Sequence, residues 1–422
     1  MTRSTDGPWD PAIVDLPLSP WRDRFLWVEE IQASPAGDAA AAVVRLGEEG
    51  FSVCVNGEPW PEPFEKIWHL RYAPDGRLVA LASREGEWTV VVDGVPWENR
   101  FSFVWSPLFS RDGSRIAVAF QRDMAYGMAV DDVPWEETFP NLTCPLLRAD
   151  GAATAAVVQT EPLSEGDIVK YREGIYTAAV DGRPWERRFM NVWGLACGAD
   201  GGGRLAAEVR LSPTEYTIAV DGTPWGETFA CVWTPLVHPV RGTVLAPVRR
   251  EGRWWLAEDG RILWDRPFVQ LWQTQVSPDG RHIAAVVAPA FGRWTVAVDG
   301  RPWKATAGEM ASDPCFSPAG GRLAVRFKDR GRWTIAVDGR VWRQARQMVF
   351  TPVFSPDGGR LCVRFKEQGR FGYLLDDRPW ELGAEAAWDP VFSPAGDRLL
   401  LRTVEGGLFR RRVLPLEDFG KV

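Results

Sequence analysis

Few residues of this 422-residue chain could carry out acid–base, nucleophilic or metal chemistry, and they are scattered along it. The three histidines, His69, His238 and His282, stand in unrelated contexts, and no HExxH or HxxEH spacing surrounds them. Zinc hydrolases use such spacings to place two imidazoles on one helix face. The G-x-S-x-G turn that exposes a hydrolase nucleophile is also absent. The sequence therefore predicts no catalytic residue, and we do not expect an enzyme.

Metal and cofactor ligands are equally hard to find. None of the six cysteines forms a CxxC or CxxCH pair, so haem attachment, a zinc clip or a ferredoxin-type cluster has no support. We expect these cysteines to be small buried hydrophobic residues. Six acids precede glycine or aspartate at similar spacing and could suggest calcium, but aspartate beside glycine is first a turn former. These acids are Asp93, Asp131, Asp181, Asp221, Asp299 and Asp338.

Composition excludes two classes of partner. The formal net charge is −7, which provides no basic surface for a phosphate backbone, so nucleic acid is not expected to bind. No apolar run approaches the roughly twenty residues that span a bilayer. The segment 1–9 lacks the apolar stretch of a secretory signal. We therefore expect a cytoplasmic protein without direct membrane insertion.

An internal repeat is the strongest signal in the sequence. The element Asp-Gly-x-Pro-Trp, with variants, recurs every 37 to 40 residues, apart from one step of 50 residues between Trp135 and Trp185. A fixed period of this size indicates a repeat architecture. The repeat tryptophans are Trp60, Trp97, Trp135, Trp185, Trp225, Trp264, Trp303, Trp342 and Trp380, and a stray copy ends at Trp9.

One copy of the repeat, within residues 310–350, reads as four short strands. They are expected at 315–316, 322–327, 333–337 and 340–342, joined by a Ser-Pro-x-Gly turn, a charged loop and an Asp-Gly hairpin. In most copies the fourth strand begins with proline, which suits an outer edge strand. Four antiparallel strands in about forty residues are typical of a propeller blade.

Aromatic residues occupy two further fixed positions. Each complete copy has an aromatic residue five positions before the hairpin acid or amide, and six copies have a second tryptophan eight positions after the Pro-Trp pair. Such regularity favours packing between blades. A stacking platform for sugars and a chain of tryptophans for electron transfer stay open as functional alternatives.

The Ser-Pro-x-Gly-like turn occurs ten times, and the last copy stops before its hairpin. We infer that an N-terminal strand completes the C-terminal blade, which removes two open sheet edges. The predicted fold is all-β: a single β-propeller domain over 1–422 with about ten four-stranded blades. A smaller ring, with degenerate copies used as loops, is the alternative.

The long step between repeats contains an insertion at 160–173. It should be a polar loop, and insertions on one face of a repeat protein often bind partners. A tolerated surface loop explains it equally well. The candidate partner-binding residues are Glu161, Glu165, Asp167, Lys170, Tyr171 and Arg172.

Two resemblances follow from these motifs. The strand entry Ser277-Pro278-Asp279-Gly280-Arg281-His282-Ile283-Ala284 resembles the PD40, or TolB-like, variety of WD40 repeat. The stretches Val92–Trp105, Val180–Trp193 and Val220–Trp233 are similar to the tryptophan-rich D subunits of the Tmc electron-transfer complexes of sulfate-reducing bacteria. That resemblance implies a cofactor-free subunit docked on an iron–sulfur subunit related to heterodisulfide reductase. A membrane cytochrome b and a tetrahaem cytochrome c are the other implied partners.

The leading hypothesis is a non-enzymatic cytoplasmic scaffold that associates with a membrane redox complex through its partners. The alternative is a ligand- or glycan-binding propeller, catalytic or not, that uses aromatic residues at the mouth of its channel. Buried tryptophans between blades would favour the scaffold, and exposed ones beside carboxylates would favour the alternative.

Overall fold

The computed structural model describes residues 9–164, 166–198 and 203–421. Two short helices, α1 (Ser19–Arg24) and α2 (Ile168–Glu173), and two 3-10 turns, Gly47–Glu49 and Leu416–Asp418, interrupt an otherwise all-β chain. The strands form ten antiparallel sheets of four strands each, and in four sheets the first strand is broken in two. These are propeller blades, as predicted. Within the described residues, no helix is long and apolar enough to cross a membrane.

The chain divides into two compact units. Unit 1 comprises Met1–Ala41, Val55–Glu58 and Phe268–Val422, and unit 2 comprises Ala42–Cys54 and Pro59–Pro267. The strands β2 (Trp27–Val28), β3 (Gln32–Ala33), β4 (Ala40–Arg45), β5 (Phe51–Val55) and β6 (Glu58–Pro59) carry residues of both. The prediction of a single domain over 1–422 stays a prediction.

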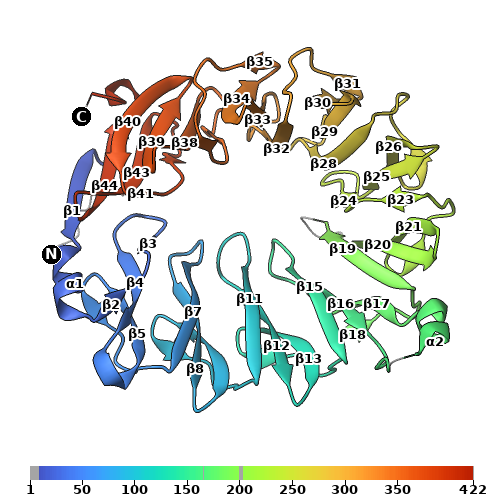
Figure 1. Ribbon diagram of the computed structural model, residues 1–422, viewed down its shortest axis with the longest axis horizontal. Coiled ribbons are helices and arrows are strands. Elements are labelled where there is room, and N and C mark those ends of the chain that lie inside the picture. Colours follow the sequence, from blue (N-terminus) through green and yellow to red (C-terminus); the bar gives the residue numbers. More distant parts are fainter. Residues whose placement is uncertain (1–8, 165, 199–202, 422) are drawn as a thin grey trace. The chain divides into compact units, whose positions relative to one another are not determined.

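Five sheets lie in unit 2, side by side, with the first strand of each at the inner edge of an arc (Figure 1). They are β7 (Lys66–Tyr72), β8 (Leu78–Arg84), β9 (Glu87–Val92) and β10 (Val95–Pro96); β11 (Phe103–Phe109), β12 (Ile116–Arg122), β13 (Ala125–Val130) and β14 (Val133–Pro134); β15 (Asn141–Leu147), β16 (Thr154–Gln159), β17 (Tyr176–Val180) and β18 (Arg183–Pro184); β19 (Asn191–Cys197), β20 (Leu205–Ser212), β21 (Glu215–Val220) and β22 (Thr223–Pro224); and β23 (Cys231–Val232), β24 (Leu236–Val237), β25 (Val244–Arg250), β26 (Arg253–Glu258) and β27 (Arg261–Ile262).

Four sheets lie in unit 1, and the same strand order recurs in each. They are β28 (Gln270–Val276), β29 (Ile283–Ala290), β30 (Arg293–Val298) and β31 (Arg301–Pro302); β32 (Met310–Phe316), β33 (Leu323–Asp329), β34 (Arg332–Val337) and β35 (Arg340–Val341); β36 (Met348–Val349), β37 (Val353–Phe354), β38 (Leu361–Glu367), β39 (Arg370–Leu375) and β40 (Arg378–Ala384); and β41 (Ala386–Ala387), β42 (Val391–Phe392), β43 (Arg398–Glu405) and β44 (Leu408–Pro415), joined by β1 (Ala12–Pro17).

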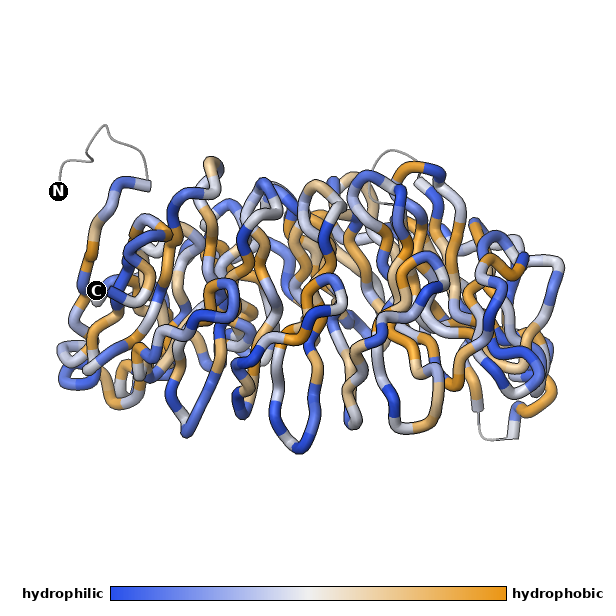
Figure 2. Tube along the Cα trace, turned by 90° about the horizontal axis from the view of Figure 1, so that it is seen from above, coloured by the Kyte–Doolittle hydropathy of each residue, from blue (hydrophilic) through white to orange (hydrophobic). Residues whose placement is uncertain are grey.

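The core lies between successive sheets rather than inside any one of them. In unit 2, Val79 and Leu81 of β8 pack with Ile116 and Val118 of β12, and all four are buried. Apolar colour follows the strands in Figure 2, while hydrophilic residues concentrate in the connecting turns. Both faces of a central strand are therefore apolar, as burial on both sides requires.

The hairpin before each fourth strand explains the repeated aspartate. Asp93 has a φ of 49°, in the left-handed region that the type I′ hairpin needs, and its Oδ1 accepts the Leu78 backbone N–H at 2.8 Å. Asp181 does the same for Thr154 N at 2.8 Å. The hairpin acids thus hold the turn against the start of the second strand, which confirms their expected role as turn formers.

Most of the fourth strands are shorter than predicted, whereas β40 has seven residues. The short ones, like β35 (Arg340–Val341), have two residues. Where a fourth strand contains proline, it is the second residue of the strand rather than the first, as in β10 and β18. The repeat tryptophan follows directly, and its N–H still bonds to the third strand, as from Trp342 N to Ile335 O at 2.8 Å. Pairing with the third strand resumes at an isolated bridge between Trp333 and Arg346.

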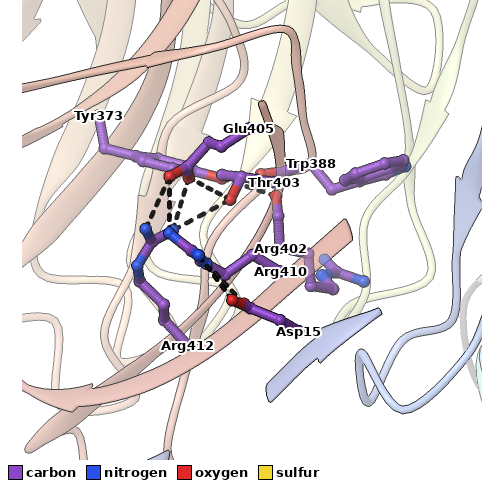
Figure 3. Close-up of polar contacts among 8 residues, drawn as sticks. All are labelled: Asp15, Tyr373, Trp388, Arg402, Thr403, Glu405, Arg410 and Arg412. Carbon is purple, nitrogen blue, oxygen red and sulfur yellow. Dashed lines mark hydrogen bonds and ion pairs between the residues drawn. The ribbon is translucent and has the colours of Figure 1, made fainter. Parts of the chain in front are cut away.

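An N-terminal strand completes the C-terminal sheet, as predicted. β1 pairs antiparallel with β44, from Ala12 opposite Val413 to Pro17 opposite Leu408. The Asp15 carboxylate accepts from Nε and Nη2 of Arg410, both at 2.6 Å (Figure 3). This pairing lowers the pKa of Asp15. The stray copy of the motif at 6–9 lies largely outside the described residues. The N-terminal strand that pairs with β44 is β1.

Candidate functional site

The insertion between β16 and β17 is the first candidate. It includes α2, at the outer edge of unit 2 (Figure 1). Glu161 pairs with Lys170 at 3.0 Å and with Arg188 of the following loop, and hydrogen bonds from these two cations lower the pKa of Glu161. The insertion is therefore held to the body of its own sheet.

Other predicted residues of this loop also stabilise it. The Asp167 carboxylate accepts the backbone N–H of Ser164 at 3.0 Å and its hydroxyl at 2.6 Å, which lowers the pKa of Asp167. Lys170 Nζ donates to the Pro162 carbonyl at 3.2 Å. Tyr171 is half-buried and Arg172 is exposed, while Glu165 lies outside the described residues.

Three aliphatic side chains are among the residues that this loop presents to solvent. Leu163, Ile168 and Val169 are 39%, 61% and 70% exposed. An ordered loop that holds Glu161 and Asp167 in internal contacts and exposes aliphatic side chains is a suitable protein contact. Sequence reasoning overlooked these residues because it weighed the polar character of the whole segment. The consecutive Ile-Val pair was the available signal.

The nine repeat tryptophans have a structural role. Trp60, Trp135, Trp264 and Trp380 are buried, and the other five are half-buried. For five of them the indole lies against the hairpin glycine of the next sheet, for example Trp60 against Gly94. The hairpins that follow Trp97 and Trp342 carry Asp132 and Asp377 in place of that glycine. This is the arrangement expected of a scaffold.

The second tryptophan series is only partly covered. Trp68, Trp193 and Trp233 are 45%, 37% and 43% exposed. Each lies close to the aromatic residue on the third strand of its sheet, and the Trp68–Trp88 ring centroids are 4.5 Å apart. These rings therefore pack within a sheet while part of each ring is exposed to solvent. The exposed part leaves the stacking alternative open.

Charged side chains occupy a position in the second strand that is apolar elsewhere. The residue opposite the second tryptophan position is Leu81 in the 66–96 sheet and Val286 in the 270–302 sheet. It is Glu208 in the 191–224 sheet and Arg326 in the 310–341 sheet. Arg364 and Arg402 occupy the same place, bonded through their carbonyls to Phe350 and Trp388. Alignment of the second strands would have revealed this change.

The three arginines contact neighbouring oxygens, although the Nε atom of each is buried and forms no hydrogen bond with a described residue. Arg326 Nη1 donates to the Val349 carbonyl at 3.0 Å, and Arg364 Nε lies 3.1 Å from Asp389 Oδ1. Arg402 donates to the carbonyls of Ser34 at 2.9 Å and Asp389 at 2.8 Å, and its burial lowers its pKa. These contacts join each sheet to the next, so the arginines hold the fold together.

A second ionic group lies beside Arg402. Glu405 accepts from Arg412 Nη1 at 2.6 Å and Nη2 at 2.7 Å, and from the Thr403 hydroxyl at 2.5 Å (Figure 3). Although burial raises its pKa, the hydrogen bonds and the two nearby arginines outweigh that effect and leave the pKa lowered. All of its partners come from the same sheet, so this group stabilises β43 and β44.

The described residues contain no group of three or more histidine, cysteine or acidic side chains placed to hold a metal ion. Cys54 and Cys362 are buried, whereas Cys144 is exposed. Burial raises the pKa of Cys197 to about 11, so this thiol stays protonated. An open groove of about 580 Å³ in unit 2 is lined by Arg115, Trp135 and other residues of two adjacent hairpins.

The chain matches no protein-family model and no curated protein sequence. Several solved structures are similar to it in fold. A eukaryotic initiation factor shares 10% identity over 82% of this chain and 92% of its own, with a TM-score of 0.47. The Dos1 propeller shares 10% identity over 74% and 90%, with a TM-score of 0.38. The propeller domain of the Trilobed protease from Pyrococcus furiosus shares 10% identity over 67% and 94%, with a TM-score of 0.31.

Proposed function

We propose that this propeller is a non-enzymatic scaffold subunit that binds a protein partner through the insertion at 160–173. The observation that carries the proposal is the aliphatic surface formed by Leu163, Ile168 and Val169, here called the insertion knob. Its loop is fixed by the Glu161 ion pairs, so little order has to be gained on binding. A preformed apolar contact of this kind favours a stable partner.

The nature of the partner comes from the resemblance to the Tmc D subunits. It implies an iron–sulfur subunit as the direct contact, with a membrane cytochrome b and a cytochrome c in the same complex. The protein would then be cytoplasmic and associate with the membrane only through these partners. The interior packing of the repeat tryptophans supports a scaffold of this type.

The test is co-purification from solubilised membranes of the native host. The tagged wild-type chain should bring haem absorption and an iron–sulfur protein with it, identified by mass spectrometry. The double variant I168S/V169S should keep its thermal stability and lose both, because it removes only exposed apolar surface.

The matched control is V95S/V133S, which alters two valines that are each 69% exposed on hairpins of unit 2. This variant should co-purify as the wild type does. A wild-type chain that emerges colourless and alone would remove the redox-scaffold proposal. Equal recovery with I168S/V169S would instead remove the insertion knob as the contact.

The open edges of Trp68, Trp193 and Trp233 favour a second candidate, a glycan-binding propeller. Replacement of Trp68 by alanine would then weaken binding to the recognised glycan by tenfold or more. A glycan array without any signal for the wild-type chain would exclude this function.

A further inference from the structure

Glu208 is a buried carboxylate without a counter-ion. It is 8% exposed, and no hydrogen bond or ion pair joins its carboxylate to a described residue. Burial raises the pKa of Glu208 to about 7, with no nearby cation to oppose the effect. An ionised group in such a place is costly unless something pairs with it. The carboxyl group therefore either keeps its proton or pairs with a cation that the described side chains do not supply.

The equivalent residue of the 310–341 sheet, Arg326, shows which groups a side chain at the Glu208 position contacts. Arg326 donates to the Val349 carbonyl of the next sheet and pairs with Asp313 of its own first strand. In the 191–224 sheet the equivalents of Asp313 and Arg326 are Gly194 and Glu208. The cation is thus replaced by an anion, and the first-strand anion is lost. The position therefore carries an acceptor where the 310–341 sheet carries a donor.

The next sheet confirms that Glu208 faces it. The strand equivalent to the one bearing Val349 is β23, and the negative charge of Glu208 helps to raise the pKa of Cys231 there. The Val232 carbonyl accepts only a weak contact from Cys231 Sγ, at 3.6 Å. Glu208 therefore lies on the side of its sheet that faces β23.

Gly194 makes room for the carboxylate. It lies at the first-strand bulge with a φ of 36°, where three other sheets of unit 2 carry His69, Ser106 and Cys144. A Cβ added to Gly194 would lie 2.8 Å from Glu208 Oε2 and 2.9 Å from Thr234 Oγ1. Any other residue would displace one of these two oxygens. The glycine thus brings a carboxylate and a hydroxyl to the same small space.

Aromatic rings lie on the same face of the sheet as Glu208. Trp193 is directly opposite Glu208 in the strand register, so both side chains lie on one face of the sheet. Tyr216 stacks on Trp193 with centroids 6.1 Å apart and an interplanar angle of 21°. Trp193 is 37% exposed and Thr234 is exposed, so solvent reaches this side of the sheet.

We propose that the recess formed by Gly194, Glu208 and Thr234, with Trp193 at its entrance, binds an alkylammonium group. An ammonium head has three donors, and the recess offers a carboxylate and a hydroxyl as acceptors. An indole face attracts the same cation. Anions are repelled by Glu208. The lysine side chain of a protein partner and a free amine share this chemistry, and the inference does not depend on the proposed scaffold function.

The test is isothermal titration of the full chain at pH 8 with two probes, n-butylammonium and Nα-acetyl-lysine methylamide. Binding of either probe, with at least a tenfold rise in Kd for E208Q, supports the site. Tighter binding of the lysine derivative identifies a protein side chain as the source, and tighter binding of butylammonium identifies a free amine. Absence of heat with both probes overturns the proposal.

Matched variants separate binding from folding. E227Q neutralises an exposed carboxylate of the same unit and should leave both titrations unchanged. G194A should weaken binding by at least tenfold, because its Cβ displaces an oxygen of the recess. E208L should abolish binding and raise Tm, since leucine or valine fills this position in other sheets. A lower Tm for E208L would show that Glu208 serves the fold instead, and would overturn the proposal.

Discussion

The indole of Trp135 lies against Gly182, the hairpin glycine of the following sheet. A Cβ on Gly182 would stand 3.3 Å from Trp135 Cβ and 3.4 Å from its Cγ. The same relationship links Trp185 with Gly222 and Trp225 with Gly260. The glycine and the tryptophan of the Asp-Gly-x-Pro-Trp motif therefore serve different interfaces. The glycine contacts the tryptophan of the preceding sheet, and the tryptophan contacts the glycine of the next sheet.

Substitution of Gly182 by alanine should destabilise the protein by about 2 kcal/mol or more. The left-handed φ of 80° costs about 1 kcal/mol for alanine, and displacement of the Trp135 ring adds a similar overpacking cost. Urea denaturation monitored by circular dichroism measures the difference in free energy of unfolding.

Gly86 provides the control for the backbone contribution. Its φ is 79°, and an added Cβ would meet nothing within 4 Å. G86A should therefore lose only about 1 kcal/mol. Equal losses in G86A and G182A would show that the contact with Trp135 contributes nothing.

Removal of residues 1–17 should expose the outer edge of β44 and cause self-association. β1 is the only described strand that covers this edge, and an unpaired strand is a template for pairing between chains. Light scattering coupled to size-exclusion chromatography should show concentration-dependent oligomers, with a lower Tm.

D15N separates the strand from its ion pair. The Asp15 and Arg410 side chains are both partly exposed, so loss of their pairing should cost about 0–1 kcal/mol and leave the protein monomeric. A truncated chain that stays monomeric with unchanged Tm would contradict the assignment of β1 as the closing strand of that sheet.

The sheets could be predicted from sequence because each is specified locally. The hairpin aspartate, the proline turn and the alternating strands all lie within about forty residues, so each copy of the repeat specifies its own sheet. Asp93 and Asp181 are examples, because each binds the start of the second strand in its own sheet. The pairing of β1 with β44 was also predictable, since a final copy without its fourth strand needs one from elsewhere.

The candidate sites were harder to predict because they depend on which side chain faces which neighbour. The polar residues of the insertion, such as Glu161 and Asp167, turn out to bond within the loop or to its own sheet. The significance of Gly194 appears only when the distance to Glu208 is known. From the sequence alone, a glycine in a repeat is interpreted as a turn residue, because its neighbours in space are not known.

R402M should destabilise the protein by about 3 kcal/mol. The guanidinium is nearly buried, and its loss leaves the carbonyls of Ser34 and Asp389 without a donor. R281M, at a side chain that is 82% exposed, should change the free energy of unfolding by less than about 0.5 kcal/mol. Chemical denaturation of both variants measures the contrast, and a near-neutral R402M would show that water replaces the guanidinium.

Glu208 should make the stability of the protein fall as the pH rises from about 4.5 to about 7. Its pKa is raised from an ordinary 4.5 to about 7, so within this window the folded chain keeps a proton that the unfolded chain has lost. The free energy of unfolding therefore decreases through the window and stays lower above it. The difference from this one group is about 3 kcal/mol.

E208Q should remove that component, because the amide does not titrate. Urea denaturation at pH 5 and pH 8 gives a pH-dependent loss of stability for each protein, and the loss should be about 3 kcal/mol smaller in E208Q than in the wild type. E227Q should behave as the wild type. Cys231, which faces the recess, has its pKa raised from an ordinary 9.0 and so does not titrate in this window. Identical losses in E208Q and the wild type would mean that Glu208 is already ionised at pH 5 and has a cationic partner in the free protein.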